Sequence, residues 1–328
     1  MYPEMQISLF NSCVSSVLSY GCEVWGLAEA KKIETIHLSF LKHLLKVKKS
    51  TPTCFVYKEC NVYPLYYDRI FRIIKYWLKI LLLEDNNPLK ILYYTTIELF
   101  KNDSFVKSNC WAINIRNLLF KNGFGHIWVN QMLGVNKNFL NVFKRRIKDS
   151  FWQSINAEIE SLSHNRLYRH LNDKSNNYLF SLPNNHIRTA ITRLRLSSHS
   201  LNVERGRWKK IEYADRKCNV CEDIDDEYHF VVCCPRFHNL RIKYLPKSLY
   251  INPSMYKFTQ YLNSQDLNKI KRLGIFLHLA FNKYTAENIF EALTMNKLTV
   301  KFFVSTLFFF FHVTCFLLFI FLYFFFHS

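Results

Sequence analysis

Along most of this chain, apolar side chains recur at the three- and four-residue steps that place them on one face of an α-helix. In the stretch 65–83 the apolar face would consist of Ile70, Ile73, Ile74, Trp77, Leu78 and Leu81. The opposite face would carry Arg69, Arg72, Lys75 and Lys79. The same spacing predicts helices over 5–19, 31–47, 104–121, 137–160, 184–196 and 251–282. We therefore expect a mainly α fold with a multi-helical body.

Glycine is scarce, with 7 in 328 residues, whereas roughly 7% is usual. Neither G-x-G-x-x-G nor G-x-x-x-x-G-K-[ST] occurs in the sequence. Phosphate-cradling loops need glycine so that backbone amides can approach the ligand, which excludes Rossmann and P-loop enzymes as first interpretations. The few glycines and 8 prolines also leave little turn chemistry for a sandwich or barrel of many short strands.

The chain carries 44 Lys and Arg against 25 Asp and Glu, a formal net charge of +19. A surplus of this size indicates a polyanionic partner rather than a small-molecule substrate. We expect RNA and DNA as partners, with an anionic membrane surface as the alternative.

Four of the 10 cysteines cluster with a histidine. The N-terminus lacks the pattern of a signal peptide, so we expect a reducing compartment where cysteine serves metal binding or packing. Cys218 and Cys221 form a C-x2-C pair, followed by His229 and then by Cys233 or Cys234. Three cysteines and one histidine at this spacing are typical of a structural Zn²⁺ site, and the spacing leaves the fourth ligand open. The segment 218–234 has few apolar residues, so one zinc ion would supply much of its folding energy.

The segment before this cluster is strongly basic. Residues 188–217 carry nine Lys and Arg against three Asp and Glu, a net charge of +6. Cations beside an aromatic ring can contact phosphates and stack on bases. The predicted nucleic-acid-binding residues are Arg188, Arg193, Arg195, Arg205, Arg207, Trp208, Lys209 and Lys210. The alternative is that these cations neutralise the acidic loop Glu222–Glu227.

Several blocks of this sequence occur in the order found in one known family. They are Tyr20–Gly26, Lys48–Pro52, Tyr63–Trp77, Arg188–His199, Glu204–Arg207 and the cluster that ends at Cys234-Pro235. Over about residues 7–282 the chain resembles the region C-terminal to the reverse-transcriptase domain of LINE-type (non-LTR) retrotransposons. The resemblance implies a CCHC zinc knuckle whose fourth ligand is Cys234. It also implies binding of template RNA and target DNA during target-primed reverse transcription.

The residues that would make such a protein an RNA-directed DNA polymerase are missing from this sequence. In the family, the palm with its two catalytic aspartates and the endonuclease domain lie upstream of the Tyr20–Gly26 block. The pair Asp225-Asp226 does not replace them, because two-metal catalysis needs a further carboxylate and rigid flanking strands. No catalytic residue or cofactor-binding loop is predicted, and we expect no activity from this chain alone. It would be a C-terminal remnant of an element, and a degenerate reading frame without selected function is the alternative.

These features divide the chain into five parts. We expect a helical region similar to a thumb or connector at 1–162, a basic helical segment at 163–217, the CCHC zinc knuckle at 218–235 and C-terminal helices at 236–290. The last part, 302–326, contains no Lys, Arg, Asp or Glu.

The apolar tail has two interpretations. As a helix of ~1.5 Å per residue it would be ~37 Å long, enough to cross a ~30 Å hydrocarbon core. The chain would then be a tail-anchored single-pass membrane protein with its basic body in the cytoplasm, because Lys297 and Lys301 precede the tail. The alternative is read-through of downstream sequence, which would leave a protein of the nucleus or cytoplasm.

Overall fold

The computed structural model describes residues 2–28, 30–101, 110–131, 138–171 and 178–287. Its helices are α1 (Pro3–Leu9), η1 (Phe10–Ser15), α2 (Ser16–Leu18), α3 (Cys22–Trp25), α4 (Lys31–Leu45), α5 (Thr53–Cys60), α6 (Leu65–Leu81), α7 (Pro88–Lys101), α8 (Trp111–Lys121), α9 (Gly125–Asn130), α10 (Phe139–Ser161), η2 (Arg166–His170), α11 (Tyr178–Ser181), α12 (Asn185–Arg195), α13 (Asn202–Trp208), η4 (Tyr213–Asp215), η5 (His229–Cys233), η6 (Pro235–Phe237), α14 (His238–Tyr244), α15 (Lys247–Tyr250) and α16 (Met255–Leu262), and residues 267–287 are also helical. Within the described residues there is no β-strand, only an isolated bridge between Lys217 and Ile224. The predicted mainly α fold is confirmed.

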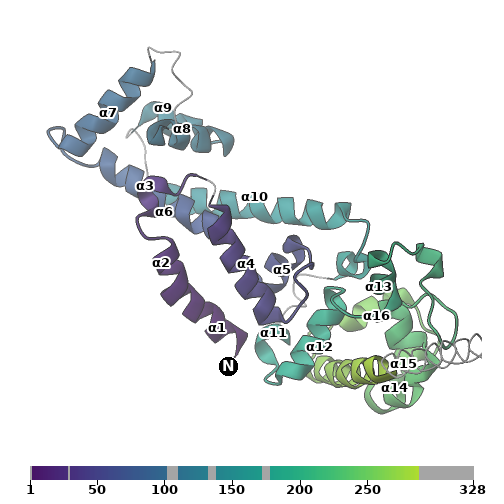
Figure 1. Ribbon diagram of the computed structural model, residues 1–328. Helices are drawn as coiled ribbons and strands as arrows, with labels where there is room; N and C mark the ends of the chain where they lie inside the picture. Colours follow the sequence, from purple (N-terminus) through teal and green to yellow (C-terminus); the bar gives the residue numbers. More distant parts are fainter. Residues whose placement is uncertain (1, 29, 102–109, 132–137, 172–177, 288–328) are drawn as a thin grey trace, which may run out of the picture.

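The molecule is elongated (Figure 1). The helices α7, α8 and α9 lie at one end, α12 to α16 lie at the other, and α10 runs between the two ends. Helices predicted over 31–47, 65–83, 137–160 and 184–196 are present as α4, α6, α10 and α12, each within a few residues of the expected bounds. The helix α7 was not predicted.

The stretch 251–282, predicted to be helical, is present as two helices with a break between them. The first part, α16, ends at Leu262, and the helical stretch 267–287 follows. The carboxylate of Asp266 accepts hydrogen bonds from the backbone N–H groups of Asn268 (2.9 Å) and Lys269 (3.4 Å). Such a cap satisfies amides that have no partner within the helix, and it starts a new helix here.

Two apolar cores hold the helices together. The smaller lies between α6 and its neighbours α7 to α10, where Trp77 is fully buried and its indole N–H donates to the hydroxyl of Tyr93 at 2.8 Å. The larger joins α4, α5 and the C-terminal half of α10 to α11, α12, the cysteine cluster and the stretch 267–287. This larger core takes in residues from both sides of the boundary expected at residue 162.

A side chain of α4 caps the N-terminus of α6. Glu34 on α4 accepts hydrogen bonds from the backbone N–H groups of Leu65 (3.0 Å) and Tyr66 (2.8 Å), which begin α6. Its carboxylate also pairs with the buried Arg69 at 2.9 Å. A carboxylate at a helix N-terminus is favoured by the helix dipole, so Glu34 fixes α4 against the start of α6.

One buried histidine gives this body a predictable response to pH. His37 lies stacked on Phe10 with ring centroids 5.3 Å apart, and its Nδ1 has no hydrogen-bond partner. Burial lowers the pKa of His37 from 6.5 to about 4. Between these values the unfolded chain binds the proton more readily, so the free energy of unfolding falls as the pH drops from 6.5 to 4, by up to about 3 kcal/mol.

We expect His37→Phe to remove this dependence while keeping the stacked ring. The measurement is urea unfolding of wild type and variant at about pH 7.5 and about pH 4.5, where the difference between the two proteins should change by about 2–3 kcal/mol. A difference that stays constant between the two pH values would show that His37 takes up its proton in the folded state as easily as in the unfolded chain.

Among the residues that the structure describes, no helix is both long enough and apolar enough to cross a membrane. The tail predicted at 302–326 lies outside the described residues.

Candidate metal centre

The cysteine pair of the cluster sits on a tight turn that the backbone itself holds. The N–H of Cys218 donates to the carbonyl of Asp223 at 2.7 Å, and the N–H of Glu222 donates to the carbonyl of Cys218 at 3.0 Å. Glu222 adopts a left-handed conformation with φ 59°, which lets the chain reverse within the turn. The bridge between Lys217 and Ile224 closes the base of this loop. Both thiols are therefore presented from one small loop.

His229 and Cys234 come from a short helical turn that follows the loop. The carboxylate of Asp226 accepts a hydrogen bond from the backbone N–H of His229 at 2.8 Å and so caps this turn. The turn is the π-helix η5, and Cys234 follows its last residue. Single π-helical turns often occur at functional sites, where they change which side chains share a face.

The side chains between His229 and Cys234 pack this turn against the larger core. Phe230, Val231 and Val232 are all fully or almost fully buried there, and the Phe230 ring stacks on Phe281 with centroids 4.8 Å apart. The prediction treated 218–235 as a small module of its own. The structure instead shows its helical half packed within the body, so the cluster and the body share one core.

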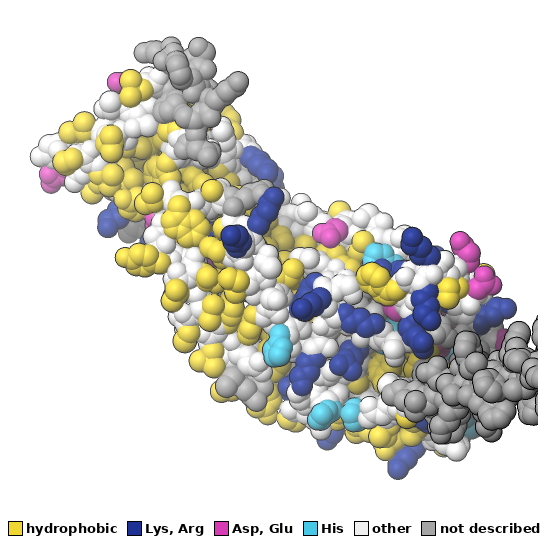
Figure 2. All heavy atoms as spheres, in the orientation of Figure 1, with side chains coloured by type: hydrophobic (Ala, Val, Ile, Leu, Met, Phe, Trp, Pro, Cys, Tyr) yellow, Lys and Arg dark blue, Asp and Glu magenta, His cyan; other side chains and the backbone are white. Residues whose placement is uncertain are grey.

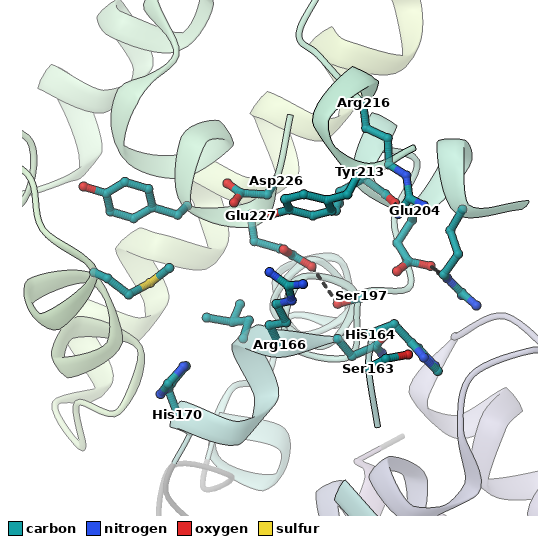
Figure 3. A pocket seen from close by; sticks show the side chains of 16 residues that line it. Ser163, His164, Arg166, His170, Ser197, Glu204, Tyr213, Arg216, Asp226 and Glu227 are labelled. Atoms are coloured by element: carbon teal, nitrogen blue, oxygen red, sulfur yellow. Dashed lines mark hydrogen bonds and ion pairs between the residues drawn. The ribbon is translucent and has the colours of Figure 1, made fainter. Parts of the chain in front are cut away.

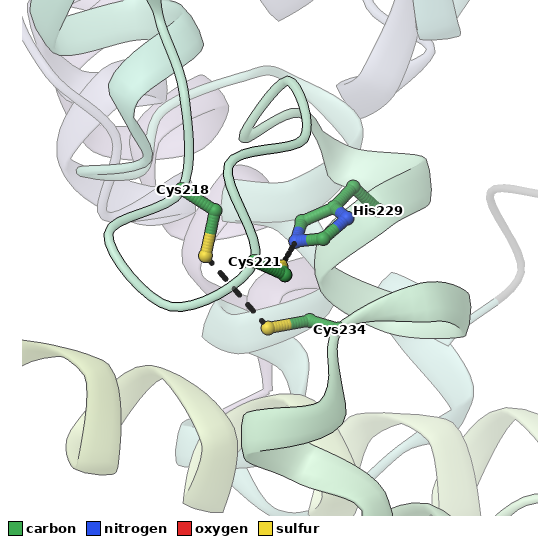
Figure 4. Close-up of side chains that lie close together, drawn as sticks. All are labelled: Cys218, Cys221, His229 and Cys234. Carbon is green, nitrogen blue, oxygen red and sulfur yellow. Dashed lines mark hydrogen bonds between the residues drawn. The ribbon is translucent and has the colours of Figure 1, made fainter.

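The four predicted ligands meet at one point (Figure 4). Their ligand atoms all lie within 4.8 Å of one another. The Sγ atoms of Cys218 and Cys234 are 3.9 Å apart, and Sγ of Cys221 lies 3.2 Å from Nε2 of His229. This Cys3His group could hold one metal ion. The alternative fourth ligand, Cys233, is outside the group, and its thiol interacts with Tyr228.

The surroundings of the group set the protonation of its ligands. Burial raises the pKa of Cys234 to about 12, and burial and the neighbouring thiol of Cys218 raise the pKa of Cys221. Burial lowers the pKa of His229, which keeps its imidazole neutral. Metals bind thiolates and neutral imidazole, so metal binding here must displace protons from the thiols.

Two neighbouring charged side chains could support these ligands, and neither was predicted. The carboxylate of Asp223 lies 3.9 Å from Nδ1 of His229, on the ring side away from the cluster. Such a partner orients a ligating imidazole. The buried Arg241 donates to the carbonyls of Val231 (2.9 Å) and Cys234 (2.7 Å) and so places a positive charge beside the sulfur atoms.

Two of the predicted nucleic-acid-binding residues have buried side chains. The guanidinium of Arg188 donates to the carbonyls of Leu182 and Pro183, the second at 2.9 Å. Arg195 is 1% exposed and pairs with Glu59 at 2.6 Å. Both guanidinium groups donate to partners inside the protein and point away from the surface that a ligand would contact.

The other predicted contacts lie at the surface. Arg193, Arg205, Lys209 and Lys210 are exposed, and Trp208 is 58% exposed. Arg207 is half-buried, donates to Glu204 at 2.7 Å and lies over the Trp208 ring at 4.6 Å. Lys and Arg side chains gather on this face of the molecule over α12, α13 and the neighbouring loops (Figure 2).

The acidic loop does not use these cations as partners. Glu227 accepts from the hydroxyl of Ser197 (2.6 Å) and lies 2.9 Å from Nε2 of His199, and these two contacts hold its pKa below the ordinary value although burial opposes them. The carboxylate of Asp225 accepts from the backbone N–H of Asn202 (2.8 Å) and from the hydroxyl of Tyr284 (2.6 Å). Within the described residues no ion pair joins the loop to the Lys and Arg of 188–217.

A polar cavity of about 260 Å³ lies between the basic segment and this loop (Figure 3). Its lining includes Arg166, Arg207 and Arg216 together with Glu204, Asp226 and Glu227. The guanidinium of Arg166 lies 4.8 Å from the centre of the Tyr213 ring. Because three cations face three acids, the cavity favours neither an anion nor a cation.

Comparisons of the chain with models of known protein families, with curated protein sequences and with solved structures found no match. A functional proposal for this chain therefore depends on the chemistry of its site. The family resemblance depends on the sequence blocks quoted for it.

Proposed function

We propose that this protein binds single-stranded nucleic acid through the exposed face of α12 and α13, beside a knuckle that holds one structural zinc ion. The observation that carries the proposal is that Arg205, Lys209 and Lys210 are exposed, as is the neighbouring Trp208. Among the described residues, no ion pair is found for these three cations.

Zinc is the metal that fits the donor set. Three thiolates and one imidazole are soft ligands that favour Zn²⁺ in a closed tetrahedral site. With Zn–S of ~2.3 Å and Zn–N of ~2.0–2.1 Å, a tetrahedral ion needs about 3.8 Å between two sulfur atoms and about 3.6 Å between sulfur and nitrogen. The observed separations of 3.9 Å and 3.2 Å need only small movements. All four positions would be filled by protein, so the ion would be structural.

The chemistry of the face suits a strand without fixed sequence. Cations bind the backbone phosphates of a strand whatever its sequence, and an exposed indole can stack on any base. Arg207, held over the Trp208 ring by Glu204, keeps the indole in a defined position. Binding should therefore depend strongly on salt and weakly on sequence.

The family resemblance gives this binding a context. In a full-length reverse transcriptase of a LINE-type retrotransposon, the corresponding region would contact template RNA and target DNA during target-primed reverse transcription. We propose that residues 7–282 correspond to that region, that they bind RNA and DNA, and that they do not catalyse polymerisation alone.

The experiment that tests the proposal measures affinity for a fluorescent single-stranded RNA over a range of salt concentrations. If Arg193, Arg205, Lys209 and Lys210 each neutralise one phosphate, the slope of log affinity against log salt should be about −3. The variant Arg205→Gln/Lys209→Gln/Lys210→Gln should change the slope to about −0.7, because one of the four contacts remains.

The matched control removes the same number of charges from a distant surface. Lys75, Lys79 and Lys121 are exposed on α6 and α8, away from α13 (Figure 1). Their replacement by glutamine should leave the slope close to that of wild type. Equal slopes for the two triple variants would show that net charge, and not this face, determines binding.

A further inference from the structure

A second pocket, of about 350 Å³, lies where the loop after α4 meets the end of α12 and the helical stretch 267–287. Its polar lining includes Lys46, Lys48, Arg193, Ser198, Ser200 and Thr285. Of these residues only Arg193 was predicted to bind nucleic acid. The pocket therefore combines two cations from one end of the sequence with one cation from the basic segment.

Contacts between distant segments build this pocket. The N–H of Lys48 donates to Oγ of Ser198 at 2.8 Å, and its ammonium group donates to the carbonyl of His199. Nε of Arg193 lies 3.4 Å from the carbonyl of Lys46. The loop after α4 is thus fastened to the end of α12, and its lysines are held beside Arg193 rather than spread over the surface.

The charge of this pocket has one sign. Among its described lining residues there is no Asp or Glu, in contrast to the balanced cavity beside the acidic loop. Burial lowers the pKa of Lys48, and the like charges of Arg207 and Arg193 lower it further, against the opposing effect of Glu204. Repulsion among these cations would be relieved by a bound anion.

The lining also supplies neutral hydrogen-bond donors. The oxygen of Ser198 accepts from the Lys48 amide, so its hydroxyl hydrogen is available to donate into the pocket. Ser200 lies beside it in the same lining. The hydroxyl of Thr285 is already used, because it donates to the carbonyl of Phe281 at 2.8 Å. Cations together with hydroxyl donors are the groups that proteins use to hold phosphate oxygens.

We propose that the pocket of Lys46, Lys48 and Arg193 binds a phosphate group of the nucleic-acid strand, with Ser198 and Ser200 donating hydrogen bonds to its oxygens. This inference rests on the proposed function for the source of the phosphate. The pocket continues the basic segment toward α4, because Arg193 lines it together with Lys46 and Lys48. A strand that crosses α13 would continue into it.

The test uses the full chain with the double variant Lys46→Gln/Arg193→Gln. Lys48 is left unchanged because its ammonium group fastens the loop to the carbonyl of His199. In the salt titration with single-stranded RNA, loss of this one phosphate site should reduce the magnitude of the slope by about 0.7. The control Lys75→Gln/Lys79→Gln removes the same number of charges and should leave the slope of log affinity against log salt unchanged. Arg193→Lys, paired with wild-type Lys46, should keep the wild-type slope.

Each other outcome identifies what is wrong. If wild type binds RNA and the α13 triple variant weakens binding, but the pocket variant keeps the wild-type slope, the pocket is not a phosphate site and the proposed function stands. If wild type does not bind RNA, both proposals fail. If the double variant instead loses binding to vesicles that contain phosphatidic acid while its RNA slope is unchanged, the phosphate comes from a lipid headgroup and the inference is overturned. Metal content and unfolding temperature equal to wild type show that the double variant is folded.

Discussion

Replacing Cys234 by serine is expected to abolish metal binding and to unfold the knuckle, whereas Cys233→Ser should leave both unchanged. The thiol of Cys234 is one of the four converging ligand atoms, and that of Cys233 is not. Structural zinc contributes an apparent ~10–16 kcal/mol in small zinc domains, which is comparable to the ~5–15 kcal/mol that stabilises a whole domain. No other single change considered for this chain should have a larger effect.

The measurement is the zinc content of the purified full chain together with its resistance to proteolysis. Wild type and Cys233→Ser should each contain one equivalent of zinc, and Cys234→Ser should contain none. Because Phe230 and Val231 are part of the larger core, cleavage in the variant should spread from the knuckle into the adjoining helices. Retention of zinc by Cys234→Ser together with its loss from Cys233→Ser would show that the fourth ligand was assigned to the wrong cysteine.

The helix α12 shows how far periodicity carries a prediction. The spacing of Ile187, Ile191 and Leu194 gave the helix and nearly its bounds. Arg188 and Arg195 are seven residues apart, two turns of the helix, so they share a face, and Arg193 lies on another. The helical spacing alone therefore places Arg193 on a different face of the helix from Arg188 and Arg195. It could not show that Arg195 is buried beside the apolar face, because its partner Glu59 lies 136 positions away.

The metal cluster could be predicted from local spacing in the sequence, whereas the pocket of Lys46, Lys48 and Arg193 could not. The ligands of the cluster lie within 17 consecutive residues, and their spacing alone brings them together on a turn and a short helix. The pocket joins Lys48 to Ser198 across 150 positions, and no local pattern predicts that contact. Asp223 had a detectable signal, as a carboxylate within the loop of a ligating histidine. The sequence contains no signal for Arg241, because the approach of its side chain to Cys234 depends on the turn at Pro235.

The buried pair of Glu59 and Arg195 carries the second large prediction. Glu59 is fully buried, and its carboxylate accepts from Nε of Arg195 (2.6 Å) and from the hydroxyls of Tyr168 (2.8 Å) and Tyr178 (2.5 Å). Burial and the charge of Glu59 raise the pKa of both tyrosines, so they remain protonated donors. The group links α5 to α11 and α12 at the centre of the larger core.

We expect Arg195→Leu to lower the free energy of unfolding by about 3–5 kcal/mol, because it leaves the Glu59 carboxylate buried without its cation. The neighbouring Arg193→Leu should change it by less than about 0.5 kcal/mol, since Arg193 is exposed. Urea unfolding of wild type and the two variants measures both values.

The double variant Glu59→Leu/Arg195→Leu identifies the cause of the loss. Removal of both charges should restore part of the lost stability, because an apolar pair leaves no unpaired charge in the core. If the double variant is less stable than Arg195→Leu, the loss comes from the packing and the two tyrosine hydrogen bonds rather than from an unpaired charge.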